Sequence, residues 1–116
     1  MKDPNCLFCK LAAGELEAEI VAEGDEWMAF RDIRPQAPTH VLVIPREHVS
    51  TVNDLKAYHE PLVGQLVRGA AEIARSEGIA DEGYRLVLNC NRGAGQTVFH
   101  VHLHLLGGRP MTWPPG

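Results

Sequence analysis

Residues 98–106 of this 116-residue chain place a histidine at every second position of an apolar stretch. Valine, phenylalanine and leucine favour strands, and successive side chains of a strand point to opposite faces. The pattern therefore predicts a strand over 98–106 with His100, His102 and His104 on one face. The other face would carry Phe99, Val101, Leu103 and Leu105. A solvated strand face rarely needs three imidazoles, and histidine is the usual acid–base side chain near neutral pH, so the row indicates chemistry.

Length and composition indicate one globular domain spanning residues 1–116. Hydrophobic residues make up 45% and charged residues 22%, which is ordinary for such a domain. The net charge is −4 and no basic run is present, so we expect no nucleic-acid partner, although a mononucleotide pocket is compatible. No apolar run could span a membrane and no signal peptide is recognisable, so we expect a cytoplasmic protein without a membrane partner.

The rest of the chain predicts four further strands, at residues 20–23, 27–30, 40–44 and 84–89. The third of them is apolar throughout, which places it in the middle of the sheet. A short helix is expected over 4–13, and one long helix lies within 54–77, with residues 53–60 as a separate turn. Short connections between most strands favour an α+β fold with a five-stranded antiparallel sheet, one long helix and one short helix.

Three uses of the histidine strand remain open from the residues alone. Neighbouring histidines could share a metal, but the outer two lie roughly 13 Å apart on a strand, so one ion cannot easily hold all three. The central imidazole of His102 could attack phosphorus and form a covalent intermediate. The upstream loop 93–97 contains two glycines, Gln96 and Thr97, which could donate to phosphate oxygens. Binding without turnover fits equally well.

Several motifs together resemble the Hint branch of the histidine triad superfamily, and the resemblance covers nearly the whole chain. The signature is His-x-His-x-His-x-x at 100–106, with apolar residues at each x. The other matching segments are 6–10, 30–40, 43–48, 95–100 and the closing Trp-Pro-Pro-Gly at 113–116. The branch comprises purine nucleoside phosphoramidases. The resemblance implies a homodimer whose two sheets join into one, and hydrolysis of the P–N bond of purine nucleoside 5'-phosphoramidates of the AMP or GMP type.

The resemblance also implies residue roles. His102 matches the nucleophile that forms a nucleotidyl-imidazole, and His40, His100 and His104 match its supporting histidines. Asp32 matches the carboxylate that accepts from both ribose hydroxyls. The remaining nucleotide contacts would be Phe8, Leu11, Phe30 and Ile33 on the purine, Asn89, Gly95, Gln96 and Thr97 near the phosphate, and Trp113 at the partner subunit's site.

Three residues of this chain depart from the pattern or stay outside it. Thr97 stands where serine is common and keeps the hydroxyl. Cys90 follows Asn89 where an acidic residue is familiar. His59 has no match, and we expect it at the surface.

Cys6 and Cys9 have the spacing of zinc ligands, and a tetrahedral site needs two more. His48 and His100 are the candidates, as in the zinc-bearing bacterial proteins that the chain resembles. The alternative is a pair of buried thiols that pack like small hydrophobic residues. Catalysis would require no cofactor, and the zinc would be structural. The rival functions are a dinucleoside polyphosphate hydrolase, which is the sister branch, and a purine nucleotide-binding or scaffold module.

Overall fold

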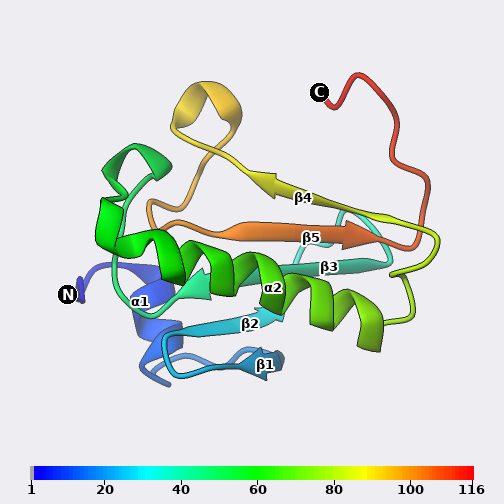
Figure 1. Cartoon of the computed structure of the whole chain (residues 1–116). Helices are drawn as coiled ribbons and strands as arrows, with labels where there is room; N and C mark the ends of the chain where they lie inside the picture. Colours follow the sequence, from blue (N-terminus) through cyan, green and yellow to red (C-terminus); the bar gives the residue numbers. More distant parts are fainter. Residues whose placement is uncertain (1) are drawn as a thin grey trace.

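The computed structural model describes residues 2–116 and contains a five-stranded antiparallel sheet with two helices (Figure 1). The strand order is β1-β2-β3-β5-β4, so the α+β prediction is confirmed. The elements in chain order are α1 (Leu7–Ala12), β1 (Ile20–Glu23), β2 (Trp27–Arg31), β3 (Thr39–Pro45), α2 (Glu60–Ser76), β4 (Tyr84–Leu88) and β5 (Leu103–Gly107). Single 3-10 turns occur at Val52–Asp54, Ala57–His59 and Arg92–Ala94. No helix in residues 2–116 is long and apolar enough to cross a membrane.

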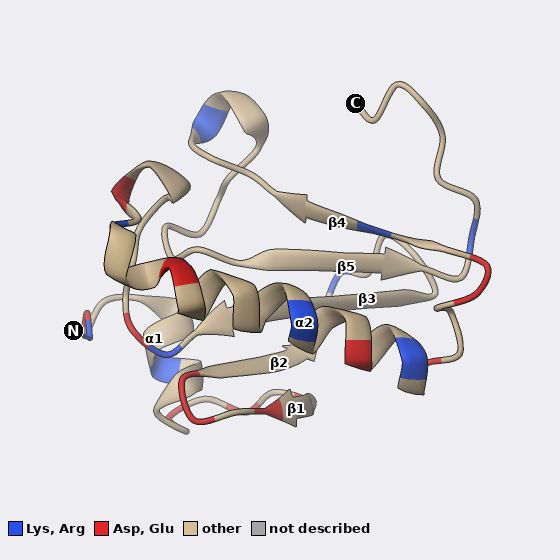
Figure 2. Ribbon diagram, viewed as in Figure 1, with Lys and Arg blue, Asp and Glu red and all other residues tan. Residues whose placement is uncertain are grey.

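The two faces of the sheet are covered by different parts of the chain (Figure 1). The long helix α2 packs on one face, where Val41 and Val43 of β3 meet Leu66 and Ile73 of the helix. The opposite face belongs to α1, whose Phe8 and Leu11 cluster with alternate residues of β2 and β3. Every residue of β3 is buried, as expected for a central strand covered on both faces. Figure 2 shows β3 and β5 without a charged residue, whereas α2 carries charges on the side away from the sheet.

The positions at which α2 begins and ends are explained by a proline and a glycine in its sequence. Pro61 lies in the first helical turn, where its missing N–H is not needed. Gly78 follows the last turn with a φ of +76°, a conformation that favours glycine. The predicted separate turn over 53–60 corresponds to the two 3-10 turns before the helix. His59 lies in the second of them and is buried rather than exposed, because its ring bonds to the carboxylate of Glu47, with Nε2 and Oε2 3.0 Å apart.

Alanine substitutions at two glycines of α2 are expected to change stability in opposite directions. A Cβ at Gly69 would lie 2.9 Å from the Trp27 ring, whereas a Cβ at Gly64 would meet nothing within 4 Å. We expect Gly69→Ala to destabilise the protein by roughly 1–3 kcal/mol, because the rigid indole must move. Gly64→Ala should stabilise it by up to about 1 kcal/mol through helix propensity alone. Urea unfolding of both variants measures the difference, and equal shifts would contradict this packing.

The strand predicted over 98–106 is wrong in its first half, because β5 begins only at Leu103. Polar groups that would have paired along the sheet bond elsewhere. The Val101 N–H donates to the Val49 carbonyl over 2.7 Å, and the Pro45 carbonyl accepts from the His100 ring, also over 2.7 Å. The predicted inward face is only partly correct. Val101, Leu103 and Leu105 are buried, but Phe99 is 45% exposed.

Candidate active site

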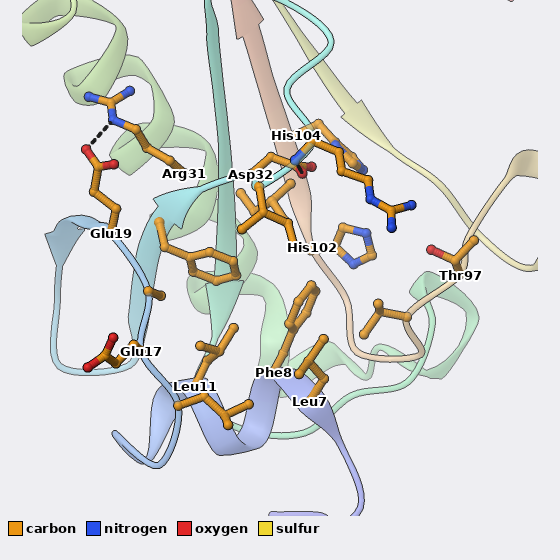
Figure 3. Close-up of a pocket in the computed structure, with 17 residues that line it drawn as sticks. Leu7, Phe8, Leu11, Glu17, Glu19, Arg31, Asp32, Thr97, His102 and His104 are labelled. Atoms are coloured by element: carbon orange, nitrogen blue, oxygen red, sulfur yellow. Dashed lines mark hydrogen bonds and ion pairs between the residues drawn. The ribbon is translucent and has the colours of Figure 1, made fainter.

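A cavity of about 790 Å³ opens on the face of the sheet opposite α2 (Figure 3). One end is apolar and the other carries His102, His104 and Thr97. The structure brings six of the predicted nucleotide-binding residues into its wall, which are Phe8, Leu11, Phe30, Asp32, Ile33 and Thr97. The wall is completed by residues that the sequence did not single out, namely Leu7, Leu16, Glu17, Ala18, Glu19, Arg31, Arg34, Leu42 and Val98.

The hydrogen bonds of His102 fix which of its nitrogens carries the proton. Its Nδ1 lies 2.8 Å from the main-chain carbonyl of His100, and a carbonyl can only accept, so Nδ1 is the protonated nitrogen. Nε2 therefore keeps its lone pair. The Phe8 ring packs edge-on against this imidazole, with centroids 5.2 Å apart. The ring is only 8% exposed yet lines the cavity, which suits an oriented nucleophile.

A second chain of hydrogen bonds fixes the tautomers of His40 and His104. The Gln36 N–H donates to Nδ1 of His40 over 3.0 Å, so the proton of His40 lies on Nε2. That Nε2 lies 2.9 Å from Nδ1 of His104 and donates to it. His104 therefore carries its proton on Nε2, the nitrogen that no protein group occupies among residues 2–116. An N–H donor beside the His102 ring, 5.0 Å away between centroids, can bond an oxygen of a bound phosphate.

Burial keeps these imidazoles neutral. Burial, together with the positive charge that His102 or His40 would carry, lowers the pKa of His104 to about 4, against the opposing charge of Asp32. The pKa of His100 also falls to about 4, mainly through burial. Burial likewise lowers the pKa of His40 and of His102, against the opposing charge of Asp32. At neutral pH the site therefore presents neutral rings, and a neutral ring is the form that can act as a nucleophile.

The lowered pKa of His104 predicts how stability depends on pH. Below about pH 6.5 the unfolded chain protonates this histidine, but the folded chain does not until about pH 4. The unfolded state then binds more protons, so the free energy of unfolding falls as the pH drops from 6.5 to 4. One such group contributes about 1.4 kcal/mol per pH unit. Urea unfolding measured between pH 6.5 and 4 tests this. We expect the free energy of unfolding of His104→Asn to fall less steeply with decreasing pH than that of the unchanged protein, and an equal slope would refute the lowered pKa of His104.

Asp32 lies between the imidazoles and the loop that follows β2. Its Oδ1 accepts from the Arg34 N–H over 2.8 Å, and its Oδ2 lies 3.5 Å from Nε2 of His40. The carboxylate is about 19% exposed and keeps acceptor positions directed at the cavity. A carboxylate with free acceptor positions can bind a diol such as that of ribose.

Four of the predicted nucleotide contacts do not line the cavity in this chain. The Gln96 side chain is used by its own loop, because its oxygen accepts from the Asn91 N–H over 2.7 Å and its nitrogen donates to Ser50 and Val98 carbonyls. Asn89 and Gly95 are also absent from the wall. Trp113 is 82% exposed and lies beside Arg85, whose guanidinium carbon is 6.0 Å from the ring centre.

Among the wall residues that sequence reasoning missed, Leu42 had a detectable signal. It lies two positions after His40 in β3 and so shares its face. Because every residue from Val41 to Ile44 is apolar, the two-residue alternation that links Leu42 to His40 could not be recognised in the sequence. Arg34 had no such signal, because it lies in a loop between β2 and β3 where no periodicity applies.

The predicted metal ligands form a second cluster beside the cavity. One ligand atom each from Cys6, Cys9, His48 and His100 lies within 4.8 Å of the others. Nδ1 of His100 is 3.3 Å from the Cys6 sulfur, and Nδ1 of His48 is 3.4 Å from the Cys9 sulfur. The opposite nitrogen of His100 donates to the Pro45 carbonyl, which leaves an unprotonated Nδ1 facing the thiols. Two thiols and two imidazoles held in this way fit a tetrahedral zinc ion.

Comparisons with known proteins agree with this geometry. The HIT domain family matches residues 13–111 of the chain. The chain belongs to the HIT family. A purine nucleoside phosphoramidase from Escherichia coli K12 is 52% identical over 105 residues, covering 90% of this chain and 88% of that protein. A HIT-like protein from Synechococcus elongatus is 47% identical over 110 residues, covering 95% of this chain and 96% of that one.

Solved HIT structures share the fold along almost the whole chain. A HIT family hydrolase from Legionella pneumophila superposes with a TM-score of 0.95 at 55% identity, covering 97% of this chain and all of the other. A histidine triad protein from Clostridium difficile gives 0.93 at 35% identity, with 97% of each chain covered. The HIT match begins after α1, so the contribution of Phe8 and Leu11 to the cavity rests on the structure of this chain.

Proposed function

We propose that this HIT protein hydrolyses the P–N bond of purine nucleoside 5'-phosphoramidates with His102 as nucleophile. One observation carries the proposal. The bond from Nδ1–H of His102 to the His100 carbonyl leaves the Nε2 lone pair in an apolar cavity of nucleotide size. The 52% identity to a phosphoramidase from Escherichia coli supports the substrate class.

In the proposed complex the purine packs between Phe8, Leu11 and Phe30, and the ribose hydroxyls bond to Asp32. Nε2 of His102 forms a bond to phosphorus while the P–N bond breaks, and the leaving nitrogen takes up a proton from solvent and departs as a neutral amine. The positive charge that develops on the ring is stabilised by the His100 carbonyl. His104 donates from Nε2 to a phosphate oxygen. Water then attacks phosphorus and gives up a proton to solvent, the bond to His102 breaks with its electron pair returning to Nε2, and the nucleotide is released.

The rival functions are distinguished by measuring kcat/KM on an adenosine phosphoramidate and on diadenosine polyphosphates. A preference for the phosphoramidate supports the proposal. A preference for the polyphosphates would move the chain to the sister activity, and no turnover of either, with AMP still bound, would favour a binding module.

We also propose a structural zinc ion held by Cys6, Cys9, His48 and His100. The donor set and the hydrogen bond from His100 to Pro45 support it. Burial raises the pKa of the Cys9 thiol, and a bound ion would supply the positive charge that stabilises thiolates there. His100 would then position His102 through its carbonyl and would not carry a proton during the reaction. Catalysis itself would require no cofactor.

A homodimer joined along β4 is the proposed assembly. β4 is an edge strand, and its apolar side chains Tyr84, Leu86 and Val87 stay partly exposed. An uncovered edge of this kind is a natural site for a second sheet. The C-terminal tail runs beyond this edge in Figure 1. Light scattering of the purified protein tests the assembly, and a monomeric mass would refute it. That the chain is one domain of the cytoplasm without nucleic-acid or membrane partners stays a prediction.

A further inference from the structure

Arg34 is held at the mouth of the cavity by its main chain. Its N–H donates to Oδ1 of Asp32 over 2.8 Å, and its carbonyl accepts from the Gln36 side chain over 3.1 Å. Pro35 follows directly, which further limits the backbone. The carboxylate of Asp32 in turn lies within 4.8 Å of the ring nitrogens of His40 and His104. The main chain of Arg34 is therefore anchored to the same carboxylate that would bind ribose.

The charge on Arg34 has no protein partner among residues 2–116. The other arginine of the wall, Arg31, is occupied, because its guanidinium makes two 2.9 Å bonds to Glu77 and one of 3.0 Å to Glu19. No carboxylate lies within 4.0 Å of the Arg34 guanidinium in the described chain. Arg34 is exposed and lines the same cavity as the imidazoles. It is thus the free cation of this cavity within the part of the chain that is described.

The glutamate carboxylates of the cavity wall lie in a different part of the cavity from the Arg34 cation. Figure 3 places Glu17 near Leu11 at one end of the cavity and Thr97 at the other end, with His102 between them, whereas Glu19 lies beside Arg31. Glu17 has no cation within ion-pair distance among residues 2–116, so the apolar end carries an unneutralised negative charge. An anionic group on a substrate is therefore repelled from that end and attracted towards Arg34.

The geometry of displacement at phosphorus determines which part of the substrate would lie near Arg34. Displacement at phosphorus places the leaving group opposite the attacking atom. The His102 ring is only 8% exposed, so the leaving group must lie on the outward side of the phosphorus, where the wall residues are exposed. Resting on the proposed function, we propose that Arg34 is a specificity residue that selects amine leaving groups carrying a carboxylate. A guanidinium pairs with a carboxylate through two parallel hydrogen bonds, which gives such selection.

The test compares two substrates that differ in one charge. AMP joined through nitrogen to glycine carries the carboxylate, and AMP joined to glycinamide has nearly the same size without it. The ratio to follow is kcat/KM for the glycine substrate divided by kcat/KM for the glycinamide substrate. We expect Arg34→Gln to lower this ratio about tenfold, since a hydrogen bond to a charged group contributes on that scale. Arg34→Glu should bring the ratio below that of Arg34→Gln. High salt should lower the ratio in the unchanged protein.

A matched control comes from Arg68, which is exposed on α2 at the opposite face of the sheet. Arg68→Gln makes the same change in net charge and should leave the ratio as it is. If Arg34→Gln lowers both kcat/KM values equally, the arginine acts on the nucleotide phosphate or on folding, and the proposal is overturned. Failure of the proposed function gives a separate result, because then neither substrate is cleaved by the unchanged protein.

Discussion

Replacing His102 by alanine or asparagine is expected to abolish turnover and to leave purine nucleotide binding intact. The side chain supplies the atom that would form the covalent bond. Removing a nucleophile costs on the order of 10⁴-fold or more in rate. Binding should persist because the proposed base and ribose contacts are Phe8, Leu11, Phe30 and Asp32, which line the cavity apart from His102. Single-turnover kinetics and calorimetric titration with AMP measure the two quantities separately.

A second buried histidine provides the control for this experiment. His59 is only 4% exposed and makes two hydrogen bonds, to Glu47 and to the Lys56 N–H, but it does not line the cavity. His59→Gln should retain the rate per folded molecule. Mass spectrometry of protein quenched during turnover adds a direct measurement, since the nucleotide should be attached at position 102. Turnover by His102→Ala, or attachment of the nucleotide to another histidine, would refute the role of His102 as the nucleophile.

The sequence predicted the sheet well because its strands are bounded by strong local signals. The apolar run of β3 ends at Pro45 and Gly78 comes just after the long helix, so both elements were recognisable from neighbouring residues alone. The histidine segment was harder. Its alternation is that of a strand, yet side-chain bonds from His100 and His102 to main-chain carbonyls replace the pairing along the sheet before Leu103. Competition between side chain and backbone of this kind has no signature in periodicity.

The histidine row and the loop 93–97 could be predicted from the residues themselves, but the rest of the candidate site only through the family resemblance. Phe8, Asp32 and His102 come from a helix, a loop and the segment before β5, and only the folded chain brings them to one cavity. Residue type alone is also an incomplete guide in the loop before the histidines. Gln96 is a suitable phosphate donor by chemistry, but its amide is consumed by Asn91, Ser50 and Val98. Such satisfaction of polar groups depends on tertiary contacts, and the sequence does not display it.

Removing zinc is expected to produce the largest change in stability. The proposed ligands join the N-terminal segment with Cys6 and Cys9 to His48 after β3 and to His100 before β5, so the ion would cross-link three distant parts of the chain. Metal-binding free energy of this kind is folding free energy. We expect about one zinc ion per chain by elemental analysis, and a decrease in melting temperature of more than about 10 °C with a strong chelator.

The third cysteine of the chain separates a metal effect from a general thiol effect. Cys90 is half-buried and lies outside the cluster, so Cys90→Ser should keep both the zinc content and the chelator response. Cys9→Ser should lose both, and its melting temperature should match that of the chelated protein. Loss of the ion should also lower activity, because His100 would no longer hold its carbonyl against Nδ1 of His102. Near-zero zinc in the purified protein, with stability unchanged by chelator, would mean that Cys6 and Cys9 pack as thiols.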